Sequence, residues 1–360
     1  MSKNWRIFLA LFLALAGVCA NGLIAWLNRG SWDADFNQYY AAGKLAGSGH
    51  LYDWDAIQKE EGPHGKVIPF GRLPFFAAAF KPLTLLPYGT ARLVWFGLRL
   101  AAWAAFPFFW PVKSRLWAWA AMAWSVSAAM CLAFGQDSMF FLFFVALGLK
   151  LLLRKHDFAA GLVLSLCASK PHLALALPVL LAARRNWRAM AGGMAGGALL
   201  LLVSTAVEGP QWLNRLLILA RLSSFDPAGE RMPNLRGLLS AVHLGMGVEV
   251  ALALIALGAT YYLCRRVPLA TGAALALAVG LWAGHHSYSY DCLLLLPVLL
   301  LPFEEPLPMP LREWAALLLT PVPYLLLLTD SPGWGALVVA GYTPVLLCGL
   351  AYRYARRPPA

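Results

Sequence analysis

Long apolar runs with short polar connections constrain this chain more than any other feature of its sequence. Only 13% of its 360 residues are charged and 60% are hydrophobic, whereas about a quarter of a soluble domain is charged. A helix that crosses a bilayer needs roughly 20 apolar residues. The sequence therefore predicts an all-α integral membrane protein, a polytopic bundle of about 12 transmembrane helices in a single domain over residues 1–360. The apolar runs lie at about 6–27, 88–111, 115–134, 138–153, 158–169, 171–183, 189–207, 247–264, 268–283, 289–302, 313–329 and 334–352.

The basic residues are spread along the chain in small groups between these runs. The formal net charge of +12 therefore indicates the positive-inside pattern of a membrane protein and not a nucleic-acid surface. All six cysteines lie within apolar runs, so no disulfide framework or Cys-based metal site is expected. The first run is longer than the apolar part of a signal peptide, and we interpret it as a spanning helix.

The segment 158–183 can be one spanning helix or two short helices that meet at Lys170-Pro171. Downstream of it, the hairpin reading places nine arginines inside and four outside, whereas a single crossing inverts this count. We therefore predict the hairpin, with both termini cytoplasmic. Each arm of about 13 residues reaches roughly 20 Å, less than the roughly 30 Å of a hydrocarbon core. Non-helical backbone at that depth predicts an outward-facing cavity with Lys170 at its floor.

Residues 28–87 form a long first extracytoplasmic loop, in which about 36–47 predicts a short helix lying on the membrane. Asp33 and Asp35 stand at the start of this loop. A carboxylate at the edge of a membrane cavity can act as a general base, but Asp35 is equally well placed to cap the short helix. Both readings stay open. The Asp-X-Asp spacing alone is weak support for a metal site.

Several other polar residues interrupt the apolar pattern. Lys170 would bind an anion, most simply a phosphate, because an ammonium at membrane depth is costly and usually functional; the alternative is a side chain that reaches the interface. Arg72 is a second phosphate candidate, whereas Lys81 suits a lipid headgroup. Arg99, inside the second run, would be either part of an ion pair or a cavity residue.

Two outer turns complete the set of candidates. Gln136 and Asp137 form the tight turn FGQDS, which a helix-capping Asp also explains. His285 and His286 stand in HHSYSYD, where a histidine could protonate a leaving phosphate or serve only a structural purpose. Asp291 is a candidate partner for them.

These segments together resemble glycosyltransferase family 87, whose members have the GT-C fold and use polyprenyl-phosphate sugars. The similar segments are DFNQYYAAGKLAGSGHLYD, PFFAAAFKPLTLLPYGTARLVW, the FGQDS turn, the AGLVLSLCASKPHLALALPVLLAARRNWR hairpin and HHSYSYD, in the family's order over about residues 30–300. GRLP departs from the aromatic-Pro-Pro run expected at that place. The resemblance implies that Asp35, which begins the Asp-X-X-X-Tyr match to Tyr39, is the base. Asp33 fits less well.

From the residues and the resemblance together, we predict an inverting glycosyltransferase of the plasma (inner) membrane with an extracytoplasmic active site. It would move a sugar from a polyprenyl-phosphate donor to a hydroxyl of a lipid or glycan acceptor. The resemblance favours mannose. No divalent metal is required, because Lys and His can supply positive charge where the leaving phosphate develops its charge. A membrane transporter or lipid flippase is the alternative, although no internal repeat is evident; a non-catalytic scaffold would leave Lys170 unexplained.

Overall fold

The computed structural model describes residues 3–27, 33–65, 67–221, 229–305, 307–327 and 332–354. Within these ranges every regular element is helical and no strand occurs, as predicted. Within these ranges each predicted apolar run coincides with a helix or with consecutive helical segments, which include the 3-10 helices η4 (Leu166–Ser169), η5 (Pro171–Leu173) and η8 (Ser289–Leu295). Residues 328 and 329 of the run 313–329 lie outside the described residues. The α-helices of these runs are α1 (Lys3–Leu27), α5 (Tyr88–Phe109), α6 (Arg115–Ala123), α7 (Val126–Phe134), α8 (Ser138–Leu153), α9 (Asp157–Ser165), α10 (Ala176–Ala183), α11 (Trp187–Glu208), α14 (Met246–Cys264), α15 (Leu269–Ala283), α16 (Leu296–Glu304), α17 (Met309–Leu318), α18 (Val322–Leu326) and α19 (Pro332–Tyr354).

Within the described residues, four helices are long and apolar enough to cross a membrane: α1, α11, α14 and α19. A fifth span arises if α6 and α7, which bend by 65° at their junction, are counted as one. Several other apolar helices are shorter, and some continue into 3-10 turns. The membrane character is thus confirmed, whereas twelve crossings and the outward cavity stay predictions.

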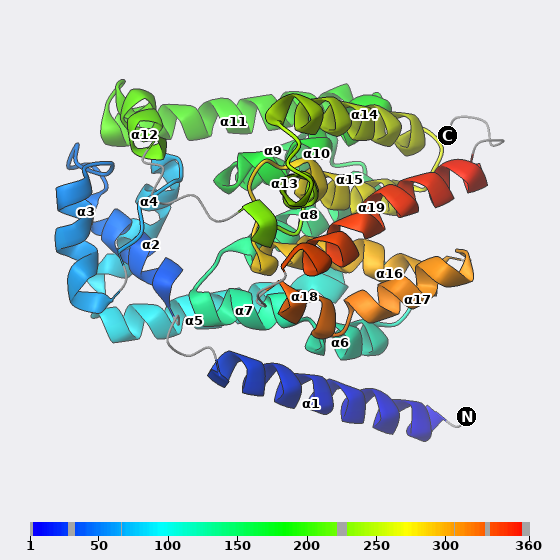
Figure 1. The fold of residues 1–360 in the computed structure, drawn as a ribbon. Coiled ribbons are helices and arrows are strands. Elements are labelled where there is room, and N and C mark those ends of the chain that lie inside the picture. Colours follow the sequence, from blue (N-terminus) through cyan, green and yellow to red (C-terminus); the bar gives the residue numbers. More distant parts are fainter. Residues whose placement is uncertain are drawn as a thin grey trace.

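The helices run mostly side by side and leave two unlike ends (Figure 1). At one end lie α2 (Ala34–Leu45), α3 (Trp54–Glu61), α4 (Pro74–Phe80) and α12 (Trp212–Ala220), which we call the outer group. At the other end α1 begins and α19 ends. The predicted short helix is present as α2, two residues earlier than expected, and its residues 36–43 are buried.

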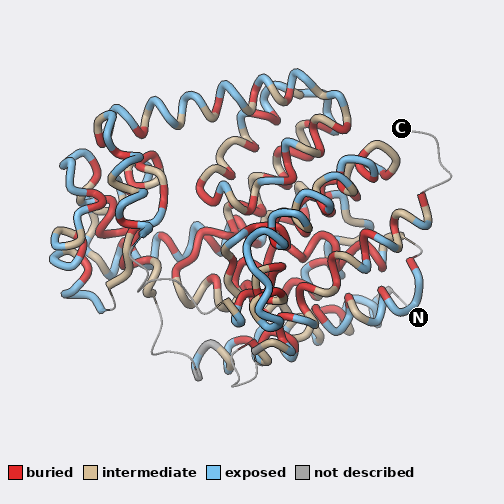
Figure 2. The backbone as a smooth tube through the Cα atoms, turned by 45° about the horizontal axis from the view of Figure 1, so that its top comes forward, coloured by how far each residue is buried: buried red, intermediate tan, exposed pale blue. Residues whose placement is uncertain are grey.

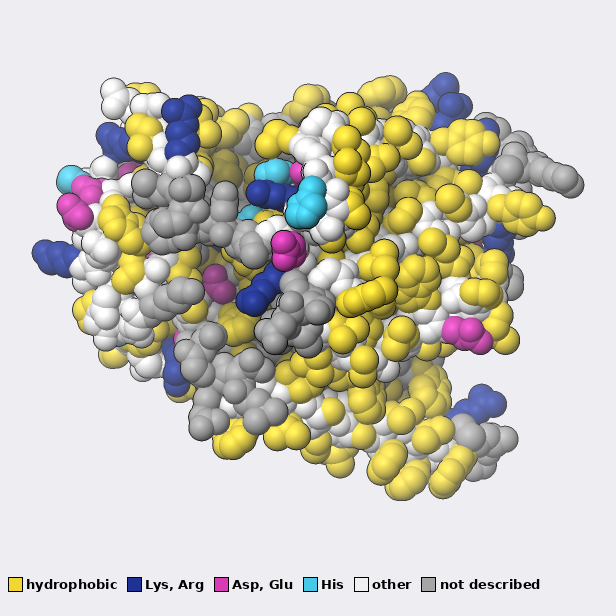
Figure 3. Space-filling view, viewed as in Figure 1, with side chains coloured by type: hydrophobic (Ala, Val, Ile, Leu, Met, Phe, Trp, Pro, Cys, Tyr) yellow, Lys and Arg dark blue, Asp and Glu magenta, His cyan; other side chains and the backbone are white. Residues whose placement is uncertain are grey.

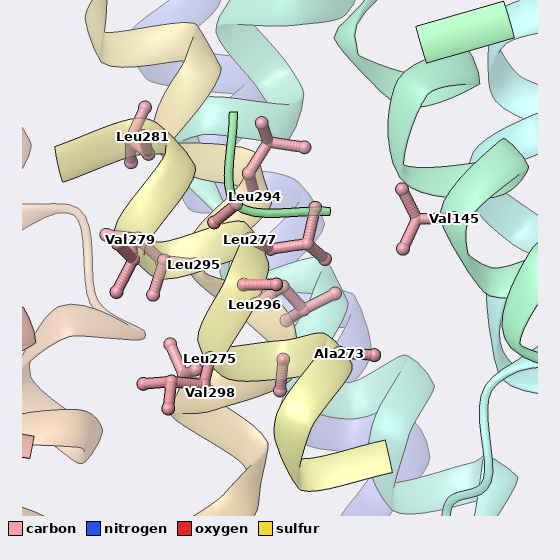
Figure 4. Packing of buried hydrophobic residues seen from close by; sticks show 14 of the residues in the cluster. Val145, Ala273, Leu275, Leu277, Val279, Leu281, Leu294, Leu295, Leu296 and Val298 are labelled. Carbon is pink, nitrogen blue, oxygen red and sulfur yellow. The ribbon is translucent and has the colours of Figure 1, made fainter. Parts of the chain in front are cut away.

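The outer group has an apolar core of its own, which includes Phe36, Tyr39, Leu51 and Phe80. A second, larger core lies inside the helix bundle, and the buried segments gather there (Figure 2). Its centre is α15, in which every residue from Thr271 to Ala283 is buried. Such a helix is apolar all round because it touches neighbours on every side. Figure 4 shows its side chains packed against residues 294–298, with Val145 of α8 nearby.

The segment 158–183 turns back on itself, as the arginine count predicted. Helix α9 packs parallel to α11, because Gly192 lies against Phe158 and Gly196 lies against Ser165. The chain must therefore reverse in α10, between them. Asn186 donates to Asp157 at 2.9 Å, which places both ends of the hairpin at one level. The glycines allow this close approach, as small residues do in membrane helix pairs.

Candidate active site

Four charged side chains from four separate segments form a buried network beneath the outer group. Arg72 makes two parallel hydrogen bonds to the Asp137 carboxylate, at 2.8 and 3.1 Å. Lys170 lies 2.5 Å from Asp291 and 3.5 Å from Asp137, and it also donates to Ser138 at 2.7 Å. All four charged residues are at least 91% buried. Their two positive and two negative charges cancel, which is how such charges are tolerated away from water.

Lys170 stands in the chain between two short 3-10 helices, Leu166–Ser169 and Pro171–Leu173. Ser165 of α9 contacts Gly196 of α11, and Lys170 follows Ser165 by only five residues. From Gly196, helix α11 continues for twelve more residues to Glu208, which is roughly 18 Å. Lys170 therefore lies below the outer end of the bundle, as its sequence position predicted. It is only 4% exposed, so the cavity expected above it stays a prediction.

Asp35 lies in the first turn of α2, half-buried beside this network. Gln136 hydrogen-bonds to its carboxylate, and the Gln136 amide oxygen accepts from Tyr39 at 3.1 Å and from Arg72 at 3.2 Å. Burial raises the pKa of Asp35 to about 6, against the lowering effects of Gln136, Arg72 and Lys170. Asp35 thus adds a fifth charge, when ionised, to an otherwise balanced network.

Asp33 occupies a different environment from Asp35. It stands at the N-cap position of α2 but makes no side-chain cap, and its φ of 60° is left-handed. Its carboxylate pairs with Arg92 at 2.9 Å near the surface. The capping explanation of Asp35 is therefore wrong, because α2 starts before Asp35 and the N-cap position belongs to Asp33. The pairing of Asp33 with Arg92 leaves Asp35 as the carboxylate beside the buried network.

Helix α5 fixes the turn that carries Gln136 and Asp137. The Arg99 guanidinium is fully buried and donates to the carbonyls of Cys131 and Leu132 at the end of α7, at 2.6 and 3.0 Å. Trp95 donates to the carbonyl of Gly135 at 2.7 Å. A cation at a helix C-terminus compensates the carbonyls that have no partner in the helix. Arg99 was expected either to be part of an ion pair or to line a cavity. Among the described residues no carboxylate lies within ion-pair distance of it, and its fully buried side chain holds the end of α7 instead.

Gly135 allows the same turn to reach the outer group. Its φ is 91°, and a Cβ there would lie 2.6 Å from the backbone nitrogen of Phe36. Any larger residue would therefore separate the turn from α2. This contact brings Gln136 to Asp35.

A second set of contacts orients Arg72. Gln38 of α2 donates to the carbonyl of Pro69 at 2.5 Å, and Tyr52 donates to that of Arg72 at 2.6 Å. Although burial alone would lower the pKa of Arg72, Asp137 and Tyr39 raise it above its ordinary value, so the guanidinium stays charged. Glu61 is fully buried in the same loop and accepts from the backbone of Ile68; burial raises its pKa to about 8.

The two predicted histidines have different surroundings. His285 is exposed, and its ring nitrogens lie 2.7 Å from Glu249 and 2.6 Å from Arg236. His286 instead faces His172, with ring centroids 6.2 Å apart, and Tyr288 at 4.8 Å. His286 is therefore the histidine next to the Lys170 turn. In Figure 3 charged and histidine side chains gather near the middle of one face, among largely apolar surroundings.

Most of the predicted site residues come together. Asp35, Tyr39, Arg72, Gln136, Asp137 and Lys170 form one continuous set of contacts, which His286 approaches through His172. Asp33 and His285 make separate contacts at the surface.

Two residues in the surroundings of Lys170 were assigned wrongly or missed. Asp291 was expected to partner a histidine, but it pairs with Lys170. The signal for this pair was present, because two opposite charges within apolar runs are expected to find each other. His172 was missed altogether, although it stands two residues after Lys170. Lys81, expected at a headgroup, donates to the carbonyl of Ala46 at 2.7 Å.

Comparison with known proteins assigns the family. The model of glycosyltransferase family 87 matches residues 74–303, which is 230 of the 360 residues. No curated protein and no solved structure matches the chain. The matched region contains Gln136, Asp137, Lys170 and Asp291, and it begins just after Arg72. The chain therefore belongs to glycosyltransferase family 87, and it is a membrane glycosyltransferase.

Proposed function

We propose that this enzyme transfers a sugar, mannose by the resemblance, from a polyprenyl-phosphate donor to a hydroxyl of a lipid or glycan acceptor. One observation carries the proposal. A half-buried carboxylate of raised pKa, Asp35, lies beside a buried network that holds Arg72 and Lys170. A base beside fixed cationic groups is what a displacement at a sugar phosphate needs.

Asp35 is the general base of this reaction. It accepts the proton of the acceptor hydroxyl while the acceptor oxygen bonds to the anomeric carbon. The bond from that carbon to the phosphate oxygen breaks, and its electron pair leaves with the lipid phosphate. A single displacement of this kind inverts the anomeric configuration. A pKa of about 6 suits the task, because the carboxylate is mostly ionised at neutral pH yet more basic than an ordinary Asp.

Lys170 stabilises the leaving phosphate. Its ammonium has three donors, and Ser138 and Asp291 take two of them at hydrogen-bonding distance. The third faces Asp137 at 3.5 Å, which is too long for a strong hydrogen bond. A phosphate oxygen would take this third donor. Asp137 keeps its two bonds to Arg72, so the exchange leaves no carboxylate without a partner.

His286 and Arg72 complete the phosphate region in this proposal. His286 lies beside the Lys170 turn and would donate a hydrogen bond to the phosphate. Arg72 contributes its charge from behind Asp137, and Tyr39 and Gln136 orient it. His285 is assigned to the surface contact with Glu249 and Arg236. We place this site on the extracytoplasmic side of the plasma membrane, because most of the basic residues between apolar runs belong to the opposite end under the predicted topology.

Purified enzyme incubated with a panel of polyprenyl-phosphate sugars tests this function. We expect one donor to be consumed when an acceptor lipid is present, and nuclear magnetic resonance should show a product of inverted anomeric configuration. The Asp35→Asn variant should bind that donor without turning it over. Transfer from a soluble nucleotide sugar in the absence of any lipid phosphate, or retention of configuration, would contradict the proposal.

A further inference from the structure

A second site lies at the end of the bundle away from the charge network. It is a cavity of about 410 Å³ between α1, α6, α16 and Leu319, the residue that follows α17. Lys113, Ser114 and Glu304 lie at one side of it, and nearly all of its other walls are apolar. Pockets for small ligands have volumes of about 300–1,000 Å³ and combine apolar walls with a few polar groups. The cavity has the size and chemistry of a ligand site.

The way in which α1 meets the bundle explains the cavity. Gly17 lets α1 approach the bend between α6 and α7, since a Cβ there would lie 2.8 Å from the Ala123 carbonyl. Asn21 donates to the same carbonyl at 2.7 Å, which the bend has freed from its helix. Nearer the start of α1, Leu13 and the indole rings of Trp117 and Trp124 line an open space instead. Helix α1 is thus anchored at the bend, and open space remains beside Leu13.

The charges around this space identify the kind of ligand. Lys113 contacts Glu304 at 3.7 Å, and its side chain is 71% exposed. Arg115 lies over the ring of Phe108, and Lys150 donates to the carbonyl of Phe108, so both are at this end. These three cations outnumber the Glu304 carboxylate, and the neighbouring Glu305 is paired with Arg353 at 3.7 Å, so this end is positive. Basic pockets between membrane helices bind anionic lipid headgroups, and tryptophans are typical of the headgroup level.

We propose that this cavity holds one acyl chain of an anionic phospholipid, whose phosphate lies against Lys113 and Ser114. The apolar walls exclude water, and the acyl chain would fill the space between Leu13 of α1 and the residues of α6 that line the cavity. The lipid therefore stabilises the attachment of the first spanning helix. This site is separate from the sugar-transfer chemistry, and its test needs neither donor nor acceptor.

Native mass spectrometry of the full-length enzyme tests the proposal. Protein purified in mild detergent is mixed with phosphatidylglycerol or with phosphatidylcholine. We expect one phosphatidylglycerol to be retained in preference to phosphatidylcholine. Ala121→Phe fills the cavity and should abolish retention, whereas Ala101→Phe, on the exposed face of α5, should not.

Two further measurements separate the contribution of the headgroup from that of the acyl chain and test whether the variants are folded. Lys113→Gln should weaken phosphatidylglycerol about fivefold, the effect of one basic residue at an anionic surface; Arg154→Gln, at the same end but away from the cavity, should change it little. Phosphatidylglycerol should raise the melting temperature of the wild type and of Ala101→Phe but not that of Ala121→Phe. Equal retention of both lipids, or unchanged retention by Ala121→Phe, would overturn the proposal.

Discussion

Replacement of Asp35 by Asn gives the sharpest test of the site, because activity and stability should change in opposite directions. Asn keeps the shape of the side chain and can still accept the Gln136 hydrogen bond, but it cannot take a proton. Loss of a general base typically lowers the rate by about 10²–10⁴-fold. We therefore expect a folded enzyme that binds donor and is nearly inactive.

The stability change follows from the direction of the pKa shift. The pKa of Asp35 is about 6 in the folded protein, above the ordinary value of 3.8, so folding favours the protonated form. The stability that this proton gives is fully present below pH 3.8 and is lost as the pH rises through 6. At pH 7 the ionised, half-buried carboxylate costs up to roughly 3 kcal/mol, at 1.36 kcal/mol per pKa unit. Asp35→Asn should thus be at least as stable as the wild type at pH 7, and its advantage should disappear below pH 4.

Two measurements check this reasoning. Thermal unfolding in detergent at pH 4 and pH 7 gives the stability, and initial rates between pH 5 and 8 give the activity. The wild-type rate should fall about tenfold from pH 7 to pH 5, as a carboxylate of pKa about 6 becomes protonated. Asp33→Asn is the matched control: Asn tolerates the left-handed backbone there, and the lost surface pair with Arg92 is worth about 1 kcal/mol or less. Near-normal turnover by a folded Asp35→Asn enzyme, with Asp33→Asn inactive, would refute the assignment.

Three further predictions follow from the same geometry. Lys170→Met should bind donor weakly and lose about 3–5 kcal/mol of stability, because it leaves the buried Asp291 carboxylate without its cation. Lys170→Arg should keep part of the affinity, and unchanged donor binding by the Met variant would make the lysine structural. Trp95→Phe removes the indole donor to the Gly135 carbonyl and should shift the acid limb of the rate profile to higher pH. The reason is that the turn then positions Gln136 less well, and the Gln136 hydrogen bond lowers the pKa of Asp35. Trp119→Phe loses a similar indole bond elsewhere and should not shift the profile. In a cysteine-free background, Arg188→Cys should react with impermeant thiol reagents only from the cytoplasmic side and His285→Cys only from the outside. Labelling of Arg188→Cys from the outside would contradict the predicted topology of the hairpin.

The helices could be predicted well because each apolar run is a local property of the chain. The runs and their order were confirmed, and so was the reversal at Lys170-Pro171, since Pro ends a helix and the arginine groups indicate which way the chain turns. The bend between α6 and α7 was not predicted. It depends on Asn21, a residue of another helix, to satisfy the carbonyl that the bend releases.

The partners within the site could not be predicted in the same way. The sequence by itself identified Asp35, Lys170 and the FGQDS turn as unusual, because polar groups in or near apolar runs are costly wherever they are placed. Only the tertiary structure decided that Lys170 pairs with Asp291, 121 positions away along the chain, and that Arg72 pairs with Asp137. Such pairs depend on which helix ends meet, and packing of the whole bundle determines this. The charge of each residue is therefore fixed by its side chain, whereas its partner is fixed by the fold.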